Sequence, residues 1–303
     1  METKIPQIFV DIPTFEGTLG HYGWSAYQNE LSGLNPSNLA YIEHNNENVV
    51  LEYQFLEQTT INSMWILGHN FNFANVQFNI SVDDAEISLT ERINYNSGTP
   101  SFDGFTMVTF ASTEMNNLKV TLAPDGAYGV DTIKIGAICL SKAYEMTHNP
   151  DMSVQYSIIH DGVKQIRSRG GATLTNTMYN KPADWADIGG AWQLDNKDNY
   201  RMGIRQYDMT FSYYTNANTF TTKASSGNID NLGIETSDNI LNDTDFIASV
   251  WNKCNKQSPF IFMPDKTDYN IDQPLIGRFM GDLKVTQQAP ALQSFSLTIR
   301  ESF

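Results

Sequence analysis

The chain has few of the features on which secreted or membrane-bound proteins depend. Its 303 residues include 2 cysteines, Cys139 and Cys254, which lie far apart, so a disulfide framework does not organise the fold. Each lies in an apolar neighbourhood and is expected to be a small buried hydrophobe. No apolar stretch approaches the length of a membrane span, and the first residues lack the regions of a secretory signal. We therefore expect a protein that is made in a cytosol and stays in solution.

Positive charge is also scarce. The chain has 19 Lys+Arg against 34 Asp+Glu, a formal net charge of -15. Residues 1–150 hold 5 Lys+Arg against 17 Asp+Glu, a net of -12, whereas residues 151–303 hold 14 against 17, a net of -3. An acidic chain repels phosphate backbones, so we expect no nucleic-acid partner. The nearly neutral second half is the better candidate for packing against partners.

Sequence motifs for catalysis and metal binding are missing too. The chain has no HExxH, no paired CxxC and no G-x-S-x-G elbow. We expect no cofactor and no metal, and we predict that the protein is not an enzyme. Two carboxylates that meet across a groove leave no trace in one sequence, so a polysaccharide-cleaving enzyme stays open as an alternative.

What the sequence does contain is strand patterning, clearest in residues 61–82. Residues 64–67 are an uninterrupted apolar run, which predicts a strand covered on both faces. Residues 74–82 alternate between apolar and polar, which predicts a half-buried strand, and a tight polar turn at 68–70 separates the two. Further strands are expected at 49–55, 105–111, 117–122 and 132–140. Short strands divided by turns indicate a mainly β protein with an N-terminal β-sandwich or jelly roll.

Breaks in composition divide the chain into three parts. Proline and glycine are frequent in residues 1–48, which are expected to form an extended N-terminal arm with a short strand at 8–10. Residues 49–148 form the sandwich, and the shift in charge balance near residue 149 marks a boundary. Residues 149–303 are predicted to be an antiparallel β domain with one helix.

That helix is expected at about 242–256. Its apolar residues form one stripe at helical spacing: Phe246, Ile247, Val250, Trp251 and Cys254. Asn242, Asp243 or Thr244 can cap its start, and Pro259 prevents continuation.

Aromatic and arginine residues of the second half have the composition of a protein–protein interface. Each taken alone is explained as well by packing in a β core, but together they predict a subunit interface. The set is Arg167, Arg169, Trp185, Trp192, Arg201, Arg205 and Tyr207.

Three residues in the first half are candidates for contact with a glycan. His69 and Asn70 follow a strand, where an imidazole and an amide can hold a sugar hydroxyl. The alternative is that Asn70 adopts a left-handed turn and His69 bonds to nearby backbone. Trp24 in the arm is a candidate aromatic platform.

Several short motifs resemble a known class of proteins. The stretch Trp-Ile-Leu-Gly-His-Asn-Phe at 65–71, followed by an alternating strand, is similar to the galactose-binding-like sandwich of tailed-bacteriophage virion proteins, as is Ile-Gly-Ala-Ile-Cys-Leu at 135–140. In the second half, Ser-Pro-Phe-Ile-Phe-Met-Pro-Asp at 258–265, Ile-Gly-Arg-Phe at 276–279 and Ser-Leu-Thr-Ile-Arg-Glu at 296–301 resemble distal tail or tail-fibre adaptor proteins.

This resemblance implies a structural virion subunit at the tail tip or at the attachment of the tail fibre. Such a subunit assembles into a homo-oligomeric ring, contacts other virion tail proteins, and resides in the virion tail after synthesis in the host cytoplasm. The alternative function is a glycan-binding module for a host surface polysaccharide.

Overall fold

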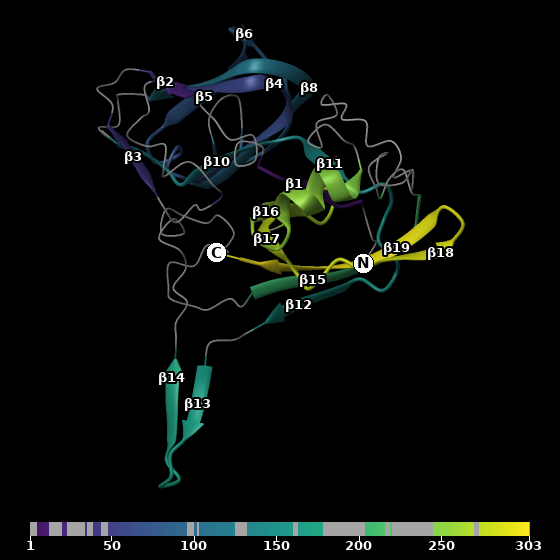
Figure 1. The fold of residues 1–303 in the computed structure, drawn as a ribbon. Helices are drawn as coiled ribbons and strands as arrows, with labels where there is room; N and C mark the ends of the chain where they lie inside the picture. The colour runs from purple at the N-terminus through teal and green to yellow at the C-terminus, as the bar shows by residue number, and fades with distance from the viewer. Residues whose placement is uncertain are drawn as a thin grey trace.

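The computed structural model describes residues 5–11, 20–22, 34, 39–43, 48–95, 100–101, 103–124, 132–159, 163–177, 204–215, 219, 245–269 and 273–302. Within these ranges the chain is mainly β, and all of its strands pair in antiparallel fashion (Figure 1). The predicted fold class is confirmed.

One large sheet is built from strands of the N-terminal half, and we call it the sandwich sheet. It contains β2 (Gly20–Tyr22), β4 (Val49–His69), β5 (Val76–Val82), β6 (Ala85–Glu86), β7 (Leu89–Ile93), β8 (Gly104–Pro124) and β10 (Ala137–Ser141). Its main path runs β10-β4-β8-β5-β6. A small sheet of β3 (Ala40–Glu43) and β9 (Thr132–Ile135) contributes to the same core.

Two strands of this sheet are longer than the sequence pattern predicts. The segments expected at 49–55 and 64–67 are one strand, β4, and those at 105–111 and 117–122 are one strand, β8. Bulges interrupt the β4–β8 register between residues 54 and 59, 61 and 63, and 67 and 69, and these allow two strands of 21 residues to bend. β4 and β5 are also not partners, because β8 pairs with both and lies between them.

A second sheet runs β11-β1-β16-β17-β19-β15-β12, and β18 also pairs with β19. The bounds are β1 (Gln7–Phe9), β11 (Ala143–Glu145), β12 (Gln155–Ile159), β15 (Ile204–Thr215), β16 (Phe260–Met263), β17 (Leu275–Met280), β18 (Val285–Ala289) and β19 (Leu292–Glu301). A separate hairpin consists of β13 (Val163–Arg167) and β14 (Thr173–Thr177).

The division into an arm and two domains needs correction. The short strand expected at 8–10 exists as β1, but it is inserted between β11 and β16 of the second sheet. The described part of 1–48 is therefore not a separate arm. The expected boundary near residue 149 also falls too late, because β11 is part of the second sheet and Met146 is buried in that sheet's core.

The apolar run at 64–67 is covered on both faces, as predicted. Met64 and Ile66 belong to the core of the sandwich. Trp65 and Leu67, which point to the opposite face, belong to a different cluster. All four side chains have an exposure of 0%.

That second cluster joins the sandwich sheet to the second sheet, and we call it the shared layer. The sandwich sheet contributes Trp65, Leu67, Phe105, Met107 and Cys139 to this layer. The second sheet contributes Phe9, Ile261, Met263 and Ile276. Trp65 meets the ring of Phe9 edge-on at 5.1 Å and stacks with Phe105 at 6.2 Å. The two sheets therefore pack against one another through one apolar layer.

The predicted helix is confirmed between residues 246 and 254. A π-helical turn, η5 (Ile247–Trp251), continues into α5 (Asn252–Cys254). Its apolar stripe packs into the core of the second sheet. The residue that caps its start is Asp245, whose Oδ1 accepts the Ala248 N–H at 2.9 Å; the caps expected at 242–244 lie outside the described residues.

Candidate functional site

One end of the sandwich exposes an aromatic ring on the turn between β4 and β5. Backbone bonds from Ala74 N–H to the Asn70 carbonyl, and from Val76 N–H to the Phe71 carbonyl, close this turn. Asn75 completes it in the left-handed region, with φ 48°. At the tip, Phe73 is 68% exposed, although a ring of this size is normally buried.

A second exposed ring lies on the outer face of the small β3–β9 sheet. In β3, Ala40 and Ile42 point inward and are buried, so Tyr41 between them points outward and is 51% exposed. Its partner across the sheet is Lys134, whose Nζ lies 5.6 Å from the centre of the tyrosine ring. This is a cation–π contact.

Asp103 binds the backbone of the turn that carries Phe73, and it interacts electrostatically with Lys134, the residue beside Tyr41. The Oδ1 of Asp103 accepts the backbone N–H of Phe73 at 3.0 Å. Burial raises the pKa of Asp103, while the N–H groups of Phe73 and Asn72 and the charge of Lys134 oppose this rise. We call Tyr41, Phe73, Asp103 and Lys134 the aromatic end.

The aromatic end combines two chemical capacities. The faces of its rings can cover apolar surface, and its carboxylate and ammonium groups can accept and donate hydrogen bonds. A sugar ring presents C–H groups on its faces and hydroxyls around its rim, which matches this combination. None of the four residues was predicted from the sequence, although the alternation of 40–43 was a signal for an outward-facing tyrosine.

His69 and Asn70, the predicted glycan contacts, are buried inside the chain. His69 Nε2 lies 2.9 Å from Thr106 Oγ1, and its Nδ1 accepts the Phe71 N–H at 3.3 Å. Asn70 accepts the Lys134 N–H and donates to the Thr132 carbonyl. Burial lowers the pKa of His69 to about 3. Both side chains therefore hold the turn and β9 in place, which corrects the prediction that they contact a glycan.

The predicted interface residues that the structure describes are Arg167, Arg169, Arg205 and Tyr207, and these four do not form one surface. Arg167 and Arg169 are exposed on the β13–β14 hairpin. Arg205 instead forms a mostly buried ion pair, with its Nη2 2.7 Å from Glu301 Oε1. Tyr207 packs against the rings of Tyr156 and Phe262. Trp24, Trp185, Trp192 and Arg201 lie outside the described residues.

The second sheet ends in a strand that is exposed along most of its length. Among the described strands, β12 pairs with β15 and is the last on its side of the sheet. Its Tyr156 and Ile158 are 43% and 46% exposed. An edge strand with exposed apolar side chains can pair with another chain. This edge is a second place at which a partner can bind.

Neither cysteine has the environment of a reactive thiol. Burial raises the pKa of both thiols, to about 12 for Cys254. Among the described residues no group of His, Cys, Asp or Glu is arranged to hold a metal ion. In the same part of the chain, no helix is long and apolar enough to cross a membrane.

Comparison with known proteins gives distant structural neighbours. No family model and no curated protein sequence matches the chain. Among solved structures, the CBM32 module CpGH89CBM32-6 produced by Clostridium perfringens has a TM-score of 0.31 at 11% identity, over 41% of this chain and 92% of its own.

Two further neighbours are modules of the same kind. The CBM32 module of AlyQ, in complex with 4,5-unsaturated mannuronic acid, has a TM-score of 0.31 at 14% identity, over 44% of this chain and 96% of its own. CBM32-1 from a family 31 glycoside hydrolase of Clostridium perfringens has a TM-score of 0.29 at 12% identity, over 41% and 90%. These neighbours are carbohydrate-binding modules, and the resemblance to phage tail proteins has no counterpart among them.

Proposed function

We propose that the protein binds a surface polysaccharide at the aromatic end and carries out no catalytic step there. The observation that supports this proposal is the pairing of two exposed rings, Tyr41 and Phe73, with the charged groups of Asp103 and Lys134. An apolar platform with a few convergent polar groups is the usual composition of a small-ligand site.

The binding mechanism follows from the four side chains. The rings of Tyr41 and Phe73 lie against the C–H faces of sugar residues. The Asp103 carboxylate accepts a hydrogen bond from a hydroxyl, and Lys134 donates to a hydroxyl or to a carboxylate of an acidic sugar. His69 and Asn70 act indirectly, because their hydrogen bonds fix the turn and the β9 backbone on which these groups are carried.

A glycan array followed by calorimetric titration of the best hit tests this proposal. We expect Tyr41→Ala and Phe73→Ala each to weaken binding at least about tenfold, which corresponds to about 1.4 kcal/mol. Tyr156→Ala removes a partly exposed tyrosine from β12 and is the matched control, with affinity unchanged. An array without a hit, or equal loss of affinity in all three variants, would refute the proposal.

The second candidate function is a structural subunit of a tailed-phage virion, placed at the tail tip or fibre attachment. Two observations favour it: the hairpin formed by β13 and β14, and the exposed edge strand β12. Both are features that a neighbouring subunit can cover. In this role the protein contacts other tail proteins in a ring and resides in the virion after synthesis in the host cytoplasm.

Mass spectrometry of purified phage particles, together with imaging of the tail, tests the second candidate. The expected result is the chain in stoichiometric amount in a ring at the tail tip. Absence of the chain from intact particles would contradict it. The two functions are compatible, because the aromatic end and the second sheet's edge are different parts of the molecule.

A further inference from the structure

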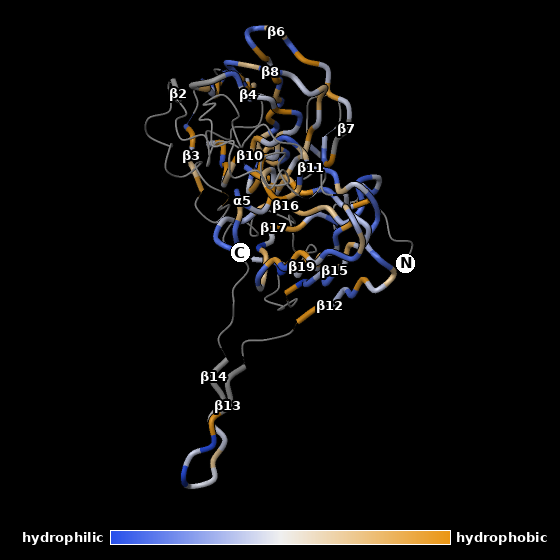
Figure 2. Tube along the Cα trace, turned by 45° about the vertical axis from the view of Figure 1, so that its right-hand side comes forward, coloured by the Kyte–Doolittle hydropathy of each residue, from blue (hydrophilic) through white to orange (hydrophobic). Residues whose placement is uncertain are grey.

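The β13–β14 hairpin stands apart from both large sheets in the part of the chain that the structure describes. Within the described residues, β13 and β14 pair with each other and belong to neither large sheet. Figures 1 and 2 show the hairpin projecting from one end of the molecule, beyond β12. A two-stranded hairpin alone is at best marginally stable in water. Ile166 is also 54% exposed, so a surface that covers the hairpin would bury apolar area as well.

The hairpin is basic although the protein is acidic. Residues 163–177 contain Lys164, Arg167 and Arg169 and no Asp or Glu, a net of +3 in a chain of net charge -15. Arg167 and Arg169 are both exposed. A cationic projection of this kind fits an anionic partner surface.

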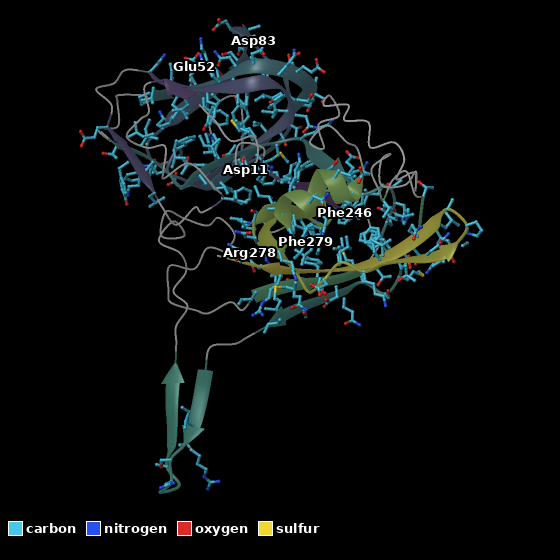
Figure 3. All side chains as sticks on the ribbon, in the orientation of Figure 1. Asp11, Glu52, Asp83, Phe246, Arg278 and Phe279 are labelled. Atoms are coloured by element: carbon cyan, nitrogen blue, oxygen red, sulfur yellow. The ribbon has the colours of Figure 1, made fainter. Side chains whose placement is uncertain are left out.

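The opposite end of the molecule carries such a surface. The β5–β6 turn exposes Asp83, Asp84 and Glu86. β6 and the hairpin lie at opposite ends in Figures 1 and 2, and Figure 3 shows Asp83 and Glu52 at the β6 end. Lys119 offsets part of this charge, since its Nζ lies 2.5 Å from Asp84 and 3.7 Å from Glu52. The β5–β6 end therefore keeps a net negative charge.

Opposite charges at opposite ends favour head-to-tail contact between copies. We infer that the basic hairpin of one copy docks on the acidic β5–β6 end of the next copy. Such a contact is heterologous, so repeated copies close into a ring or extend as a filament. The inference rests on the assembly role given above as the second candidate function and is independent of glycan binding.

Charge reversal with rescue tests the contact. Arg167→Glu with Arg169→Glu makes the hairpin acidic, and Asp84→Lys with Glu86→Lys makes the β5–β6 end basic. Either variant alone then presents like charges at both docking surfaces. When the two variants are mixed one to one, the hairpin of each variant can meet a β5–β6 end of opposite charge on the other variant. The full-length wild type, both variants and their mixture are compared by sedimentation velocity at about 0.02 M and about 0.5 M salt.

The expected wild-type result is self-association at low salt that is lost at high salt. Each variant alone is expected to associate at least about tenfold more weakly, and the mixture is expected to recover wild-type behaviour. The control is Lys142→Glu with Lys284→Glu, which makes the same change in net charge as the hairpin variant, but at exposed positions outside both surfaces. It is expected to associate like the wild type. Circular dichroism spectra confirm that every variant is folded.

Three outcomes would overturn the inference: a wild type that stays monomeric at low salt, a mixture that shows no recovery, or a control that weakens association equally. Loss of retention on an anionic polymer by the Arg167→Glu, Arg169→Glu variant, with self-association intact, would assign the hairpin to such a polymer instead. A ring that persists in this variant would leave the assembly role standing and remove only the hairpin contact.

Discussion

Replacing Trp65 with alanine tests whether the shared layer holds the two sheets together. The side chain has an exposure of 0% and contacts Phe9 from the second sheet and Phe105 from the sandwich sheet. Truncation of a buried tryptophan costs about 3–5 kcal/mol through lost apolar burial and the cavity that remains. The two ring contacts, worth about 0.5–1.5 kcal/mol each, are part of this cost. This is a large share of the total stability of a typical protein.

Because the shared layer belongs to both sheets, the substitution should destabilise both sheets. We expect denaturant unfolding, followed by circular dichroism, to shift to lower concentration as a whole. Hydrogen exchange should show protection falling together in β4 and in β16. Met152→Ala, at a position that is 100% exposed, is the control and should leave stability unchanged within about 0.5 kcal/mol. A loss below about 1 kcal/mol, or a loss confined to one sheet, would refute the reasoning.

Three further predictions concern stability. Gly277→Ala should destabilise by about 1–3 kcal/mol, because the added Cβ would lie 2.8 Å from side-chain atoms of both β17 and β19. Gly170→Ala on the hairpin should not destabilise, because the nearest atom to its added Cβ would be Ser168 Oγ at 3.9 Å, an ordinary contact distance. Glu301→Ala breaks a buried ion pair and should cost about 3–5 kcal/mol, whereas Lys266→Ala at a more exposed pair should cost about 0–1 kcal/mol. His69 stays neutral in the folded state with its pKa at about 3, against 6.5 unfolded. Its contribution to stability is therefore present above about pH 6.5 and falls by about 2 kcal/mol between about pH 7 and about pH 5, a fall that His69→Gln should remove.

Thermal and denaturant unfolding measure all three effects. A Gly277 variant as stable as the Gly170 variant would show that β17 and β19 are packed less closely than described. Equal costs for the Glu301 and Lys266 variants would contradict the difference in burial between the two ion pairs. For His69, the decisive quantity is the difference between the wild-type and variant pH profiles, because carboxylates titrate in the same range in both. A constant difference would contradict a buried neutral imidazole.

Local patterns predicted the strands and the helix because those depend on neighbouring residues. The run at 64–67 indicated a strand covered on both faces since its four consecutive side chains are apolar. The stripe of Phe246, Val250 and Cys254 indicated the helix in the same way. By contrast, the continuity of β4 and β8 was missed. The polar residues at 57–60, 112–114 and 116–117 resemble turns, and no local pattern shows that the strands continue through them with bulges.

The aromatic end was missed because it depends on contacts between distant segments. The hydrogen bond from Phe73 to Asp103 spans 30 residues, and Tyr41 meets Lys134 through the register of β3 with β9. His69 was proposed as a contact residue because an imidazole beside an amide can hold a sugar hydroxyl, whereas the structure shows the alternative, a bond to nearby backbone. Its burial depends on Thr106 in β8, the strand inserted between β4 and β5.

Hydrogen exchange of the full chain, with and without the best ligand from a glycan array, tests the central claim most directly. If the aromatic end binds the sugar, added protection should appear in residues 39–43, 70–75 and 132–135, and Tyr41→Ala should reduce it. Protection confined to other parts of the chain, or none at saturating ligand, would contradict a glycan site at this end of the sandwich.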